Sequence, residues 1–182
     1  MADLTGRMMG AAQADVKTFS EIEADPNAFT QAVTVIVIAG VSSLVGNIFR
    51  GGIVSGVIGL VGSLVGYALF SLLVFLIGTK LMPEPTTKAD FNETFRTVGF
   101  AASPGALNFL AIIPFLGPLI SLLIALWSLV IGVIAVREVL DYSNTGRAII
   151  VCLIAFVVCL IVYSLLLIPI LGAMLVTHAA LG

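Results

Sequence analysis

Charged side chains are scarce in this sequence: they make up 10% of its residues, whereas hydrophobic residues make up 60%. A soluble domain carries about one quarter charged residues, so this chain lacks the polar side chains needed to cover a globule in water. From residue 29 onward, charge interrupts the apolar sequence mainly around 80–96 and 137–147. The composition therefore excludes a water-soluble fold and predicts an all-α, polytopic helical membrane protein.

Reactive side chains are equally scarce. Cys152 and Cys159 are seven residues apart in one apolar run, which in a helix is about 10 Å and beyond disulfide reach. The single histidine, His178, stands alone near the end of the chain. No nucleophile–base pair or metal-ligand group is recognisable, so we expect no catalytic residue, no metal and no cofactor. The net charge of −2, without a basic cluster, argues against nucleic-acid binding.

Apolar runs of the length needed to cross a bilayer, about 20 residues, occur five times. The first follows Asp25-Pro26, a helix-capping residue before a proline at the first helical position. Only Arg50 and Gly51 separate the first two runs, which predicts a tight antiparallel hairpin. The five predicted spans cover residues 29–49, 52–78, 97–113, 119–140 and 148–170.

The third and fourth spans come from one apolar stretch, residues 97–136, with a breaker cluster at Pro114–Pro118 near its middle. This hairpin leaves and returns on the same side whether or not its tip crosses the membrane. The distribution of charge therefore leaves two readings open, five full spans or three spans with a re-entrant hairpin.

Basic residues are distributed very unevenly between the two sides of this arrangement. Seven of the eight fall in residues 1–28, 79–96 and 137–147, and only Arg50 falls on the other side. Because basic residues are retained in the cytoplasm, the bias predicts a plasma-membrane protein with a cytoplasmic N-terminus and the C-terminus opposite.

Small residues recur at helical spacing on two spans, where they let another backbone approach closely. Three alternative roles fit these helix-packing seams: packing within the bundle, a homodimer face, or a glycine-lined path for a substrate. They comprise Gly52, Gly56, Gly59, Gly62, Ser63 and Gly66 on the second span, and Ser121, Ala125, Ser128, Gly132 and Ala135 on the fourth. Asn108 is expected to bond across helices, and Trp127 to fill the bundle.

The predicted cytoplasmic side begins with residues 1–28, in which residues 8–22 have the pattern of one amphipathic helix. It either lies on the cytoplasmic end of the bundle or docks a partner. Charged residues at the helix ends either anchor the bundle and pair locally or form a partner-binding face. They are Arg96, Arg137, Glu138, Asp141 and Arg147, with Arg137–Asp141 and Arg96–Glu138 as the pairs that could form.

Several short motifs make the chain similar to a known family. They are FSEIEADPNA at 19–28, FRTVGFAASP at 95–104, IPFLG at 113–117, LWS at 126–128, VREVLD at 136–141 and SNTGRA at 143–148. Over roughly residues 15–170 the sequence resembles the Yip family, small membrane proteins named for interaction with Ypt/Rab GTPases. The resemblance implies five helices, a cytoplasmic N-terminus and a nearly bare far side.

Family function transfers less readily. The Asp-Leu-Tyr-Gly-Pro motif of eukaryotic members is absent, and the N-terminal region is shorter than theirs, so Rab binding is not implied. The chain resembles a bacterial member, which implies the inner membrane.

Two functions follow from these features. The first is a non-enzymatic scaffold or adaptor that acts through helix packing and a charged cytoplasmic face. Its partners would be the lipid bilayer, other membrane proteins, a cytoplasmic protein or a second copy. The alternative is a small solute transporter or channel subunit with helices broken at Pro104 and Pro114. A polar cavity reaching mid-bilayer would favour the alternative, and a closed apolar bundle would count against it.

Overall fold

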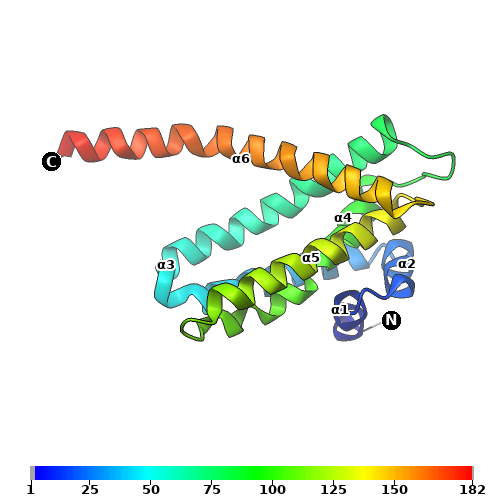
Figure 1. Cartoon of the computed structure of the whole chain (residues 1–182), viewed down its shortest axis with the longest axis horizontal. Helices are drawn as coiled ribbons and strands as arrows, with labels where there is room; N and C mark the ends of the chain where they lie inside the picture. The colour runs from blue at the N-terminus through cyan, green and yellow to red at the C-terminus, as the bar shows by residue number, and fades with distance from the viewer. Residues whose placement is uncertain (1–2, 182) are drawn as a thin grey trace.

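All regular structure in the described chain is helical. The computed structural model describes residues 3–181, without the side chains of residues 50, 51, 55 and 166–181. Its elements, shown in Figure 1, are α1 (Leu4–Ala12), α2 (Val16–Ala24), α3 (Ala28–Leu76), the π-helix η1 (Ile77–Leu81), α4 (Phe91–Gly99), the 3₁₀-helix η2 (Phe100–Ile112), α5 (Gly117–Val139) and α6 (Thr145–Leu181).

Among the described residues, four helical segments are long and apolar enough to cross a membrane: Ala28–Phe49, Gly52–Leu81, Gly117–Val139 and Thr145–Leu165. The first two form α3, which breaks at Gly52 and turns back on itself (Figure 1). Gly52 has a φ of +69° and a ψ of 175°, a conformation that a residue without a side chain adopts easily. Gly52 therefore makes the predicted turn between two arms, 28–49 and 52–76.

The predicted third span, residues 97–113, differs from expectation in its helix type. The α-helix α4 ends at Gly99, and the chain continues for 13 residues as the 3₁₀-helix η2. Pro104 explains the change, because in an α-helix its ring would clash with the carbonyl of Phe100, four residues earlier. Every residue from 94 to 105 is buried, so this segment is the centre of the bundle.

The N-terminal segment also differs, because two helices replace the single amphipathic helix expected over residues 8–22. The chain turns at Ala14, which has a φ of +59°. Asp15 then caps α2, accepting hydrogen bonds from the backbone nitrogens of Lys17 (3.4 Å) and Thr18 (3.2 Å). A carboxylate that starts a new helix competes with continuation of the old one.

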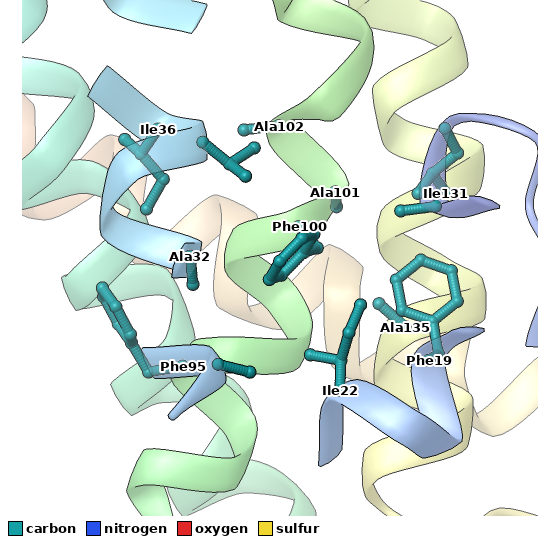
Figure 2. Close-up of a cluster of buried hydrophobic side chains, with 13 residues drawn as sticks. Phe19, Ile22, Ala32, Ile36, Phe95, Phe100, Ala101, Ala102, Ile131 and Ala135 are labelled. Atoms are coloured by element: carbon teal, nitrogen blue, oxygen red, sulfur yellow. The ribbon is translucent and has the colours of Figure 1, made fainter. Parts of the chain in front are cut away.

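The N-terminal hairpin packs into the bundle core. Phe19 and Ile22 of α2 are fully buried, and they lie beside Phe100 and the α5 residues Ile131 and Ala135 (Figure 2). Ala32 and Ile36 of α3 close the same cluster from the other side. Burial of large apolar side chains is worth about 1.5–3 kcal/mol each. The α1–α2 hairpin is therefore an integral layer of the fold.

The opposite side of the bundle is more open. The second arm of α3 and helix α6 lean away from α5 and η2, and α6 continues beyond the far end of the other helices (Figure 1). Helix α6 passes Pro169 and reaches Leu181, so the span predicted to end near residue 170 is part of a longer helix.

Candidate functional site

A cleft of about 820 Å³ lies between the second arm of α3, the helix η2, α5 and α6, with the first arm of α3 as its floor. This volume falls within the range of small-molecule sites, about 300–1,000 Å³. Its walls consist mainly of glycine, alanine, serine and apolar side chains. Among the described residues that line it there is no Asp, Glu, Lys, Arg or His.

The two predicted seams face this cleft from opposite sides. The cleft is lined by Gly52, Gly56, Gly59, Ser63 and Gly66 of α3 and by Ser121, Ala125, Ser128 and Gly132 of α5. Two seam residues lie elsewhere: Gly62 is outside the described lining, and Ala135 belongs to the core around Phe19. The seams of α3 and α5 are therefore separated by space.

The seam glycines differ in how closely other groups approach them. Gly56 lies against the side chain of Leu44, and Gly66 lies against the hydroxyl of Tyr163. That hydroxyl donates a hydrogen bond to the carbonyl of Gly62, at 2.9 Å, and ties α6 to α3. In contrast, a methyl group added at Gly59 or Gly132 would meet no described atom within 4 Å. The middle of the cleft thus retains room on both walls.

Uncharged polar side chains gather at one end of the cleft, near the turn between η2 and α5. They are Ser43, Asn47, Asn108 and Ser121. The Asn47 amide donates to the Ser43 carbonyl at 3.0 Å. Within the described part of the chain, no hydrogen bond involves the side chains of Asn108 or Ser121.

Asn108 therefore does not form the expected hydrogen bond across helices. Ser42 connects the first arm of α3 to η2 instead. Ser42 donates to the carbonyl of Ala106 at 2.6 Å and accepts from the backbone nitrogen of Phe109 at 3.3 Å. Nothing in the sequence distinguishes Ser42, because it is one serine among several in an apolar span. Asn108 is left to face the cleft.

The second candidate region is the helical cap, defined as α1, α2 and the ends of α4 and α5 that contact them. Arg96, which was expected either to anchor the bundle or to belong to a partner-binding face, is only 6% exposed. Its Nε atom donates to the carbonyls of Ile22 (3.0 Å) and Glu23 (2.9 Å), and its Nη2 atom also donates to Glu23. Its carboxylate neighbour is Glu93, at 3.6 Å, in place of the expected Glu138. Arg96 thus holds the C-terminal end of α2.

A second buried arginine, Arg7, holds α1 in the same way. It is 6% exposed and forms 2.8 Å contacts with Asp25 Oδ2 and Gln31 Oε1 at the start of α3. The guanidinium of Arg7 lowers the pKa of Asp25 through this hydrogen bond. Arg7 was not among the predicted site residues, although it is the one basic residue within an otherwise uncharged α1.

Trp127 fixes the turn between α1 and α2 to the flank of α5. Its indole Nε1 donates to the carbonyl of Ala12 at 2.8 Å, and the side chain is 45% exposed. The expectation that Trp127 fills the bundle is therefore wrong. A solvent- or lipid-facing indole usually satisfies its N–H, and here the end of α1 supplies the acceptor.

The remaining predicted face residues divide into two groups. Glu138 accepts from Ser20 Oγ at 2.6 Å, and Arg147 lies 3.4 Å from Glu84 Oε1, so both are engaged within the chain. Arg137 and Asp141 are exposed. Arg137 donates to the carbonyl of Tyr142 at 3.3 Å, and no ion pair joins it to Asp141 in the described structure.

The cap should dock more weakly as pH rises. Burial raises the pKa of Glu23 from 4.5 to about 7, Asp141, Glu93 and Glu138 add to the rise, and Arg96 opposes it. A raised pKa in the docked state means that the contribution of Glu23 to docking is fully present below pH 4.5 and is lost as pH rises through 7. Protease accessibility of residues 13–17 should therefore increase over this interval. Glu23→Gln should abolish the increase, whereas Glu21→Gln, at an exposed carboxylate, should retain it; retention by both would contradict the assignment.

These features together define a class: an all-helical integral membrane protein with four apolar spans among its described residues, a lateral cleft and a docked helical cap. The chain belongs to the Yip1 family, since the family model described as the Yip1 domain matches residues 13–166. The resemblance found in the sequence motifs is thereby confirmed. No curated protein and no solved structure matches the chain.

Proposed function

We propose that this family member is a non-enzymatic scaffold or adaptor. It binds a protein partner through the exposed part of the helical cap, on the cytoplasmic side of the membrane. The observation that carries the proposal is the burial of Arg7 and Arg96, which use their charge to fix α1 and α2 against the bundle. We define the cap surface as four exposed charged side chains on α2 and at the end of α5: Lys17, Glu21, Arg137 and Asp141.

The physical argument is preorganisation. Ordering of side chains and loops on binding costs about 0.5–1.5 kcal/mol per immobilised side chain. A cap already packed around Phe19 and tied by hydrogen bonds avoids much of that cost. The cap surface carries two positive and two negative side chains, which suits a protein of complementary pattern better than an anionic headgroup layer or nucleic acid.

Site-specific crosslinking tests the adaptor function. A photoreactive amino acid at Glu21 in the full-length protein in its native membrane should give a discrete protein adduct. Arg137→Glu should lower its yield about tenfold, because it places a like charge where the partner carries a complementary one. Lys88→Glu, the same change at an exposed residue outside the cap surface, should leave the yield unchanged. Equal yields from both variants would refute the proposal.

We infer further that the chain crosses the inner membrane five times and has a cytoplasmic N-terminus. The four apolar spans are joined by one further crossing, η2, which is the third in chain order. A 3₁₀-helix rises about 2.0 Å per residue, so the 13 residues of η2 and the last turn of α4 together reach about 30 Å. That length equals the hydrocarbon thickness of a typical bilayer, about 30 Å. The turn before α5 would then emerge on the far side, where the Phe115 side chain is 98% exposed.

Cysteine labelling tests this topology. After replacement of Cys152 and Cys159 by serine, a cysteine at Phe115 should react with a membrane-impermeant maleimide added to intact cells. A cysteine at Thr86, in the exposed loop after η1, should react only after the cells are opened. Protection of residue 115 would support the re-entrant hairpin instead.

One observation favours the alternative function, a small solute transporter or channel subunit. The cleft is bordered by η2, a 3₁₀-helix that contains Pro104 and continues the α-helix α4, and helices of irregular form border the sites of many transporters. Its described lining includes no Asp, Glu, Lys, Arg or His, the side chains that coordinate charged solutes or relay protons in many transporters. The apolar lining supports the adaptor over the transporter.

A further inference from the structure

We propose that the cleft is a binding site for one ester-linked acyl chain of a membrane glycerolipid. The lipid's ester group would lie at the polar end of the cleft, beside Asn108 and Ser121, and its tail would run between the two seams toward the cytoplasmic side. This inference goes beyond the adaptor function and uses none of the cap residues. It rests on the proposed topology for the statement that the lipid comes from the far leaflet.

The part of the cleft that α5 borders has the length of an acyl tail in a single leaflet. On α5 the lining begins at Ser121 and reaches Gly132, eleven residues further along the helix. At about 1.5 Å per residue this distance is about 16 Å. One leaflet contributes half of the hydrocarbon core, about 15 Å. A tail that starts beside Ser121 would therefore end near Gly132.

The volume of the cleft accommodates one acyl chain. At roughly 30 Å³ per methylene, close to the volume share of a water molecule, a 16-carbon chain needs about 480 Å³, which is less than the cleft's volume of about 820 Å³.

The chemistry of the lining also matches this ligand. The middle of the cleft is bounded by Gly59, Gly132 and apolar side chains, with open space beside both glycines. The side chains at its polar end are uncharged donors, and those of Asn108 and Ser121 are unused by the described chain. An ester carbonyl accepts such hydrogen bonds and requires no counter-ion. Convergent polar groups at one end of an apolar pocket fix the orientation of a ligand.

A photoreactive lipid tests the tail. The full-length protein is reconstituted in phosphatidylethanolamine–phosphatidylglycerol vesicles that contain a trace of phospholipid with a diazirine in mid-chain. After irradiation, adducts should concentrate on residues 59–66 and 128–132 relative to the outward-facing Leu153. Gly59→Leu should lower the cleft adducts about tenfold by filling the space. Gly62→Leu is the matched control, because it adds the same side chain three residues away, outside the described lining.

The polar end is tested separately with diester and diether forms of the same photoreactive lipid. The wild-type protein should label about tenfold better with the diester, and the double variant Asn108→Ala, Ser121→Ala should lose this preference while remaining folded.

Equal labelling of cleft and outward faces, or equal labelling of the two glycine variants, would overturn the site. A dimer captured by a photoreactive residue at Gly59 would overturn it in favour of a second copy. Failure of the Phe115 labelling alone would change only the leaflet from which the lipid comes.

Discussion

Replacement of Arg96 by alanine should release α2 from the bundle. The guanidinium donates to two backbone carbonyls at the end of α2 while it is 6% exposed. Hydrogen bonds from a charged group contribute about 1.5–3 kcal/mol, so we expect docking of the cap to lose about 3 kcal/mol. Phe19 and Ile22 would then lose their burial. Proteolysis at Lys17 in detergent-solubilised protein measures the release.

The controls separate this role from a loss of charge. Arg96→Lys keeps the charge but loses the planar fork that reaches both carbonyls, so it should fall between wild type and alanine. Arg137→Ala removes an exposed arginine from the same end of the bundle and should change protection by less than about 0.5 kcal/mol. If Arg96→Ala were as protected as Arg137→Ala, the burial of Arg96 would have no role in docking.

Two glycines of α3 should respond oppositely to the same substitution. A methyl group at Gly46 would meet the backbone carbonyl of Asn108, where the first arm of α3 crosses η2. Because backbone cannot rotate away, Gly46→Ala should destabilise the bundle by about 1–3 kcal/mol. Gly59→Ala adds a methyl group in open space and should be neutral or stabilise by up to about 1 kcal/mol through helix propensity. Reversible unfolding in mixed micelles measures both, and equal effects would contradict the close approach of α3 and η2.

Much of the architecture could be predicted from composition and local breakers. The shortage of charge indicated the membrane, the two-residue Arg50-Gly51 connection indicated the hairpin, and Pro114–Pro118 indicated the turn before α5. These signals are local, since each depends on backbone freedom or solvent preference within a few residues. The helix type of η2 was missed, although Pro104, whose ring would clash with the Phe100 carbonyl of an α-helix, was a local signal for it.

The candidate site was less predictable, because a sequence identifies a face without identifying what covers it. Periodicity placed Gly59 and Gly132 on helix faces suited to close packing, and the structure opens a cleft between those faces. The sequence left open whether Arg96 anchors the bundle or belongs to a partner-binding face, because it does not show which groups surround the guanidinium. Its burial depended on the carbonyls at the end of α2, which become available only when the chain turns at Ala14.

The bond from Trp127 to Ala12 gives this protein an intrinsic optical reporter. Trp127 is the only tryptophan in the chain, so all indole fluorescence comes from the place where the turn after α1 meets α5. Detachment of that turn would remove the acceptor at 2.8 Å and change the polarity around the indole. Emission wavelength and quenching therefore follow attachment of the N-terminal hairpin in real time, in unlabelled protein.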